Sequence, residues 1–240
     1  MFHINGKKPW AILPLKSISL SNSRLTPILT TYERRILSLT MVKDVVNVLN
    51  CAPSVGGLLV VTKCEIIKTH CQALGATVLE EDGLPQLNTA IMQAVQFLES
   101  RGIEKFFTVP GDVPLLNVSE IDILVQSFQM SEGLTLVPSQ DGMGTNSIAS
   151  KIPLPVQPRF GVNSLLEHHK IAKNKGVSVE ILPLKGFSFD IDWPSDLVRL
   201  VSIGNSSRTQ DYLSSLDLEY REYPILEDNF SQFEKIKGLG

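Results

Sequence analysis

The chain has 240 residues, of which 43% are hydrophobic, and a formal net charge of −3 at pH 7. This apolar content is enough for one large α/β core. The nearly balanced charge gives no electrostatic reason to expect nucleic acid or an anionic membrane as a partner. The sequence holds no apolar stretch of about 18 residues and no signal-peptide pattern, so it predicts a soluble protein.

The cysteines point to a reducing compartment. There are three, Cys51, Cys64 and Cys71, and no two of them form a CxxC pair. An odd number of unpaired cysteines is typical of reduced thiols, which predicts a cytoplasmic protein. Buried or half-buried thiols account for them more simply than a metal site does.

Apolar runs and helical patterns alternate through the first part of the chain. Strands are expected at Trp10–Leu15, Gly57–Thr62, Ala76–Leu79, Lys105–Val109 and Leu134–Pro138. Helices are expected at Tyr32–Leu49, Glu65–Leu74, Leu87–Ser100 and Val118–Met130. This alternation predicts an α/β fold, Rossmann-like, with a mostly parallel central sheet.

Helix ends are visible in several places. The hydroxyls of Thr31 and Ser119 are positioned to cap the first and fourth helices. Gly75 and Gly102 follow the second and third helices, where a left-handed residue commonly ends a helix.

The regular alternation stops after Ser139. Residues 139–164 are rich in proline and glycine and predict a functional loop with short strands. Beyond it we expect a helix over 163–175, strands over 178–182 and 187–191, and a helix beginning near Pro194. The pattern weakens from about Asn205, so we expect one domain over residues 1–204 and a tail over 205–240 that is loosely ordered or docked.

Two cations lie in the segment that leaves the first strand. Lys16 and Arg24 stand within LPLKSISLSNSRL, at the edge where open α/β sheets bind ligands. Both side chains can bind phosphate groups, although their positions alone are more typical of solvated surface cations. The segment has no glycine-rich phosphate loop.

Three carboxylates follow predicted strands. Asp112 lies between two prolines in VPGDVP, at the carboxyl end of an expected strand, where it either binds Mg²⁺ or stabilises a turn. Asp190 and Asp192 are two residues apart on the expected strand, so their side chains would share a face and repel each other unless a cation lies between them. Alternatively, Asp192 caps the helix that begins at Pro194. We favour a metal site because Asp112 supplies a third carboxylate.

Two turn motifs complete the candidates. DGMGTN contains Thr145, and RFGVNS contains Gly161 and Ser164 at the start of a helix, whose amides can bind an anion. Ordinary turn and capping roles remain open for both motifs. His168 and His169 follow on the same helix, where single histidines are more often surface or packing residues.

These segments in this order resemble the 2-phospho-L-lactate guanylyltransferase family of coenzyme F-420 biosynthesis, which includes relatives using phosphoenolpyruvate or 3-phosphoglycerate. The matching segments are LPLKSISLSNSRL, LNTA, VPGDVPLL, DGMGTNS, RFGVNSLLEH and FDIDWPSDL. They span roughly residues 11–200. Two positions depart from the family pattern: Asn22 stands where a lysine is common, and Met143 interrupts the glycines of the second motif.

The resemblance implies a single-domain nucleotidyltransferase fold of the GT-A-like type, and roles for particular residues. It implies that Asp112, Asp190 and Asp192 bind Mg²⁺. It also implies that Lys16 and Arg24 are cations near the triphosphate. It implies that the phosphorylated acid is held by Thr145, Gly161 and Ser164. Asn88 is implied as a residue of the nucleotide pocket. The implied substrates are GTP and a small phosphorylated acid, and a homodimer is plausible.

Other functions are compatible with the same architecture. A molybdopterin guanylyltransferase or sugar-phosphate nucleotidyltransferase usually carries a glycine-rich loop after the first strand, which this sequence lacks. A metal-dependent glycosyltransferase carries an Asp-x-Asp motif like that of Asp190 and Asp192, but nearer mid-chain. A non-catalytic GTP-binding module would bind the nucleotide without releasing pyrophosphate.

Overall fold

The computed structural model describes residues 7–18, 22–83, 86–129, 131–204, 207–216 and 218. Parts of three expectations lie outside these residues: 19–21 of the first loop, Met130 at the end of the fourth helix, and 205–206, 217 and 219–240 of the tail. Within the described ranges, no helix is both long and apolar enough to span a membrane.

A seven-stranded sheet in the order β3-β2-β1-β4-β6-β5-β7 forms the centre of the molecule. Its strands are β1 (Trp10–Pro14), β2 (Gly57–Val61), β3 (Thr77–Leu79), β4 (Lys105–Thr108), β5 (Leu134–Pro138), β6 (Thr145–Lys151) and β7 (Val179–Ile181). β6 runs antiparallel to β4 and β5, whereas β1 pairs in parallel with β2 and β4, β2 with β3, and β5 with β7. The expected mostly parallel α/β sheet is therefore confirmed.

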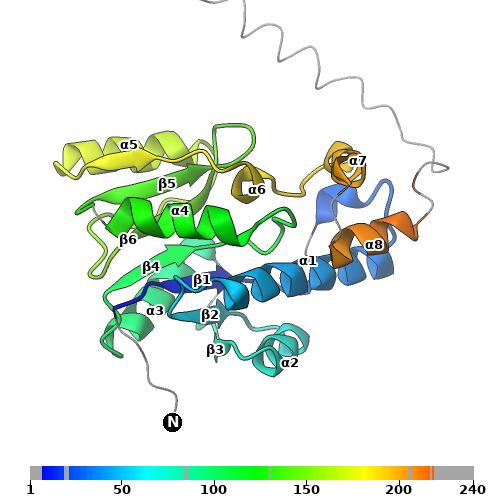
Figure 1. Cartoon of the computed structure of the whole chain (residues 1–240), viewed down its shortest axis with the longest axis horizontal. Coiled ribbons are helices and arrows are strands. Elements are labelled where there is room, and N and C mark those ends of the chain that lie inside the picture. Colours follow the sequence, from blue (N-terminus) through cyan, green and yellow to red (C-terminus); the bar gives the residue numbers. More distant parts are fainter. Residues whose placement is uncertain are drawn as a thin grey trace, which may run out of the picture.

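Helices cover both faces of this sheet. They are α1 (Thr31–Cys51), α2 (Glu65–Ala73), α3 (Leu87–Glu99), α4 (Val118–Gln129), α5 (Ser164–Asn174), α6 (Lys185–Ser188), α7 (Pro194–Ile203) and α8 (Arg208–Ser214), with a short 3-10 helix, η2, at Ser23–Leu25. Side chains of α1, α2 and α4 pack on one face, and those of α3 and α5 pack on the other. Figure 1 shows α1 and α4 crossing the same side of the strands.

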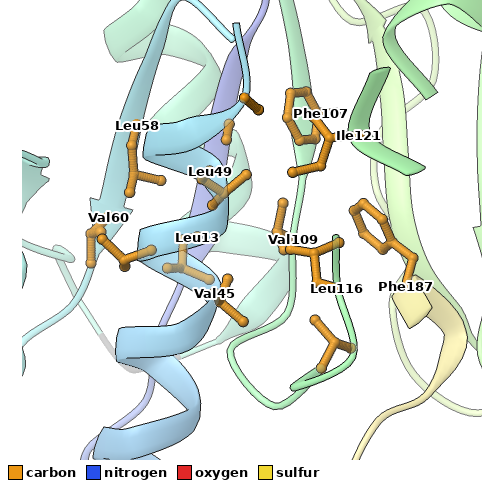
Figure 2. Packing of buried hydrophobic residues seen from close by; sticks show 14 of the residues in the cluster. Leu13, Val45, Leu49, Leu58, Val60, Phe107, Val109, Leu116, Ile121 and Phe187 are labelled. Atoms are coloured by element: carbon orange, nitrogen blue, oxygen red, sulfur yellow. The ribbon is translucent and has the colours of Figure 1, made fainter. Parts of the chain in front are cut away.

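Burial on both faces explains the unbroken apolar run of β1. Ala11 and Leu13 point to the side of α1, whereas Trp10 and Ile12 point to the side of α3. A strand covered on both faces needs apolar residues at every position, so it shows no alternation with polar ones. Figure 2 shows Leu13 packing among side chains of α1 and β4.

Two predicted caps are wrong by one or two residues. Thr30, not Thr31, caps α1: its hydroxyl accepts from Glu33 N, and the Glu33 carboxylate accepts from Thr30 N. At α4 the side chain of Asn117 accepts from Glu120 N, and Ser119 lies inside the helix. Hydroxyl and amide side chains compete for the same amide, and the sequence does not show which of them is oriented for it.

The predicted strand over 187–191 is wrong. Residues Lys185–Ser188 instead form the helical turn α6, and the segment after it runs without regular structure. The carboxylate of Glu120 accepts hydrogen bonds from Gly186 N and Phe187 N, which fixes this turn against α4. This tertiary contact overrides the apolar alternation of the segment.

A separate apolar cluster joins segments that are far apart in the chain. It unites Leu25, Ile28 and Leu29, which follow β1, with buried residues of α1, α7 and α8. These segments lie together at one end of the molecule in Figure 1. The carboxylate of Asp44 in α1 accepts from the amide and hydroxyl of Thr209 in α8. The described part of the expected tail therefore contains a helix that is docked on the domain.

Candidate active site

A cavity of about 520 Å³ opens along the edge of the sheet where the parallel strands end. Its lining includes residues at the carboxyl ends of β1, β2 and β4 and at the start of the antiparallel β6, which meets the same edge. Six of the predicted site residues line it: Lys16, Arg24, Asp112, Thr145, Asp190 and Asp192. The tertiary structure thus gathers residues that are far apart in the chain.

A backbone contact brings the three carboxylates together. Ile191 N donates to Asp112 O at 3.0 Å, which fastens the 190–192 segment to the turn after β4. Asn146 of β6 donates to Asp190 Oδ1 at 3.1 Å. The shared site of Asp190 and Asp192 is predicted from a strand that the structure does not contain. Both residues nevertheless line the cavity, because the backbone contact with Asp112 holds their segment in place.

The charged forms of Asp112 and Asp190 are unfavourable at these positions. Burial, together with the charges of Asp190 and Asp192, raises the pKa of Asp112 to about 7, against a lowering by Lys16. Burial also raises the pKa of Asp190, although the hydrogen bond from Asn146 opposes this. Buried like charges of this kind are relieved by a cation.

The chemistry of these donors fits a hard divalent cation, since carboxylate oxygens are its preferred ligands. In the conformation of the structure, however, no three His, Cys, Asp or Glu side chains of the described residues are arranged to hold a metal ion. One reason is visible at Asp192, whose carboxylate binds Arg24. Ligation by all three carboxylates therefore requires side-chain rearrangement.

Arg24 is held between two neighbours. Its Nη1 lies 2.5 Å from Asp192 Oδ2, and its guanidinium carbon lies 5.0 Å from the centre of the Trp193 ring. The buried Asp196 accepts from Asp192 N and Trp193 N and so fixes this turn. Asp196, rather than Asp192, thus binds the backbone amides before α7, and the alternative in which Asp192 caps this helix is wrong.

Gly111 allows the first loop to approach the turn after β4. A Cβ atom at this position would lie 2.4 Å from Leu15 Cδ2. Leu15 is buried, and its neighbour Lys16 is exposed at the cavity. The glycine of the VPGDVP motif therefore leaves room for the Leu15 side chain between the segments that carry Lys16 and Asp112.

Thr145 and Ser164 form a buried polar cluster with His168. Ser164 Oγ donates to Thr145 Oγ1 at 3.2 Å, and His168 Nδ1 lies 3.1 Å from the same oxygen. Arg159 N donates to His168 Nε2 at 2.7 Å, so Nδ1 carries the proton of the neutral ring. Burial lowers the pKa of His168 to about 4. The cluster sets the position of the Thr145 hydroxyl at the cavity wall.

Three predicted residues do not line the cavity: Ser164, Gly161 and Asn88. Gly161 is exposed, has a φ of 141° and accepts from Ser164 N through its carbonyl. Asn88 uses both ends of its amide on the backbone of Phe160, accepting from its N–H at 2.8 Å and donating to its carbonyl at 3.2 Å. Asn88 therefore anchors the loop of Phe160, itself a lining residue, and the geometry gives no support for a direct nucleotide contact.

Three residues that line or support the cavity are not among the predicted site residues. Asn146 orients Asp190, Glu81 is a buried carboxylate in the lining, and His168 orients Thr145. His168 follows Ser164 by four residues, so both lie on one face of α5. The spacing of four residues indicates that Ser164 and His168 can interact. Single helix histidines are more often surface or packing residues, so the sequence alone does not favour a site role for His168.

A known protein family matches most of this chain. Residues 10–227 match the family described as "Guanylyl transferase CofC like". The chain belongs to this family. The CofC-like match covers the cavity-lining residues, β1 to β7 and α8, so the fold and the predicted motifs fall inside it.

Curated relatives of this CofC-like chain bear three different names. A phosphoenolpyruvate guanylyltransferase of Sphaerobacter thermophilus is 32% identical over 82% of this chain and 96% of its own. A 3-phospho-D-glycerate guanylyltransferase of Colwellia psychrerythraea is 29% identical over 83% and 94%. A 2-phospho-L-lactate guanylyltransferase of Methanobrevibacter smithii is 26% identical over 87% and 91%. The family resemblance inferred from the motifs is confirmed.

Solved structures show the same fold at low sequence identity. A nucleotidyl transferase of Methanothermobacter thermautotrophicus has a TM-score of 0.60 at 13% identity, over 87% of this chain and 99% of that one. A 4-diphosphocytidyl-2C-methyl-D-erythritol synthase of Anaerococcus prevotii has a TM-score of 0.56 at 13% identity, over 88% and 98%. The expected nucleotidyltransferase fold is thus confirmed for this CofC-like chain.

Proposed function

We propose that this protein transfers the guanylyl group of GTP to the phosphate of a small phosphorylated acid in coenzyme F-420 biosynthesis. A phosphate oxygen of the acceptor forms a bond to the α-phosphorus of GTP. The bond from that phosphorus to the oxygen between the α- and β-phosphorus atoms breaks, and pyrophosphate leaves with the electron pair. The observation that carries the proposal is the cavity, where two cations face a cluster of carboxylates beside Thr145.

The chain's own residues position and neutralise two anionic reactants. An acceptor phosphate is largely ionised near neutral pH, so the attack needs no general base. Arg24 uses Nη1 on Asp192, and an arginine has five N–H donors, so further donors are available for the oxygens of the leaving pyrophosphate. Lys16 adds a second, exposed cation from the same loop.

Thr145 contributes a fixed hydroxyl for the acceptor at the wall of the same cavity. Ser164 and His168 hold its oxygen from two directions, which reduces the reorganisation needed when an acceptor binds. We place the acid there because Thr145 starts β6, next to Asn146 and Asp190. We propose Gly161 and Ser164 as supporting members of the same subsite.

Asp112, Asp190 and Asp192 would hold Mg²⁺. When bound, this ion would offset the negative charge that develops during transfer. The proposal rests on the oxygen donors and on the burial and mutual repulsion that raise the pKa of Asp112.

A pyrophosphate-release assay tests the reaction. It crosses GTP, ATP, CTP and UTP with 2-phospho-L-lactate, phosphoenolpyruvate and 3-phospho-D-glycerate, with and without Mg²⁺. We expect release with GTP, Mg²⁺ and at least one of the three acids. Release that occurs equally without any acid would contradict guanylyl transfer, and GTP binding without release would indicate a binding module.

Two further expectations accompany the proposal. We expect a cytoplasmic protein, since Cys51, Cys64 and Cys71 are all free thiols in the structure. A homodimer also remains an expectation, and size-exclusion chromatography with light scattering tests it.

A further inference from the structure

We propose that Glu81 selects the guanine base, its carboxylate accepting hydrogen bonds from N1–H and the exocyclic amino group. This inference deepens the proposed function and rests on it. Nothing in the motifs or in the names of the relatives assigns a role to this residue.

The two ends of the cavity differ in chemistry. The section at β1, β4 and β6 carries the cations and the carboxylates, including Lys16 and Asp112. The section at β2 and α3 is lined by apolar side chains, namely Val61, Leu87, Ala90 and Ile91. A triphosphate belongs with the cations, so the flat base of the same nucleotide occupies the apolar section.

Glu81 is the charged residue of that apolar section. It follows β3 by two residues, is 8% exposed and lines the cavity. Among the described residues, no Lys, Arg or His forms a salt bridge with it. A buried carboxylate is costly unless hydrogen-bond donors satisfy it, so its place in a ligand cavity indicates that the ligand supplies donors.

A backbone contact holds the carboxylate in position. Gln86 N donates to Glu81 Oε1 at 2.9 Å, which joins the residue to the start of α3. An ionised carboxylate has about four acceptor sites, so this bond leaves capacity on both oxygens. The group is therefore oriented in advance and can still accept from a base.

Guanine presents the matching pattern. Its N1–H and its amino group on C2 are adjacent donors, which a carboxylate accepts side by side. Adenine has an acceptor at N1 and hypoxanthine lacks the amino group, whereas xanthine has a carbonyl at C2 that a carboxylate repels. A site built to bind such donors discriminates strongly against analogues that lack them, because its own polar atoms are then left unpaired.

The test compares GTP, ITP, XTP and ATP by kcat/KM for pyrophosphate release, at a saturating concentration of the acceptor found active in the panel. Wild-type protein should prefer GTP over ITP, and both over XTP and ATP. Glu81→Gln should lower kcat/KM for GTP on the order of a hundredfold and raise it for XTP. The Gln amide donates to the C2 carbonyl of xanthine while its oxygen accepts from N1–H.

The gain with XTP distinguishes base selection from damage to the fold, because a misfolded variant does not gain activity. Glu80→Gln is the matched control, since Glu80 is exposed and adjacent, and it should keep the wild-type preference. An unchanged GTP preference in Glu81→Gln, or a folded variant without gain for XTP, would overturn the inference.

The wild-type measurements also separate the two proposals. If Glu81→Gln fails to fold, equal kcat/KM values for GTP and ITP in the wild-type protein would still overturn the role of Glu81. Pyrophosphate release from all four nucleotides at similar rates would contradict the role of Glu81 and leave nucleotidyl transfer in place. No release from any of them would contradict the proposed function itself.

Discussion

Arg24 and Asp192 form a salt bridge across 168 residues of chain, at the wall of the cavity. Both side chains are about half exposed, at 53% and 46%, so the pair adds little to stability. An exposed pair of this kind typically contributes less than about 1 kcal/mol. Its importance lies in placing the cation that we propose to bind phosphate beside a carboxylate of the proposed metal site.

Replacing this cation should therefore affect turnover more than folding. We expect Arg24→Ala to lower kcat on the order of a hundredfold, because a charge that stabilises the leaving pyrophosphate is lost. Its urea midpoint should stay close to that of the wild type. Arg35→Ala, at an exposed position on α1 outside the cavity lining, is the control and should retain full activity. Equal losses in both variants would remove Arg24 from the site.

Asp190→Asn should reduce turnover on the order of a hundredfold or more while the fold is kept. The Asn side chain preserves the oxygen that accepts from Asn146 but removes the charge that would hold Mg²⁺. Steady-state rates over a range of Mg²⁺ concentrations check this, with the exposed Asp211→Asn as the control. Near-normal turnover at limiting Mg²⁺ would show that Asp190 is not a ligand.

His168 should make stability depend on pH. Its folded pKa of about 4 lies below the ordinary value of 6.5, so the unfolded chain binds the proton more readily. The stability that depends on the neutral ring is complete above pH 6.5 and is lost as the pH falls towards 4, by up to about 1.4 kcal/mol per pH unit.

Urea unfolding between pH 7 and pH 4.5 measures this effect. His168→Gln should be less stable at neutral pH, yet its stability should fall less steeply with acid. His169→Gln, at the exposed neighbouring position, should retain the wild-type slope. If His168→Gln and the wild type lose stability in parallel, another group is responsible.

Gly111→Ala should disturb the site through packing. The new methyl group would meet Leu15 Cδ2 at 2.4 Å, and overpacking of this kind costs about 1–3 kcal/mol. Adding Leu15→Ala makes room, so the double variant should be less destabilised than the sum of the single ones. Urea unfolding of all four proteins gives the coupling energy, and additive effects would contradict the proposed contact.

The sequence by itself determined the architecture and part of the lining of the cavity. Apolar runs without alternation indicated strands buried on both faces, and the structure has β1, β2 and β4 in those places. The motifs named Lys16, Arg24 and the three aspartates, all of which line one cavity. Apolar runs and short motifs are local features of the sequence, so they can be recognised without the tertiary structure.

Only the tertiary structure decided how these residues meet. The segment before α7 is not a strand, because Glu120 binds the backbone of Gly186 and Phe187 from another helix. The pairing of Arg24 with Asp192 and the burial of Glu81 and His168 likewise depend on contacts between distant segments. No periodicity in the chain encodes such contacts, since each is fixed by packing that exists only after the layers assemble.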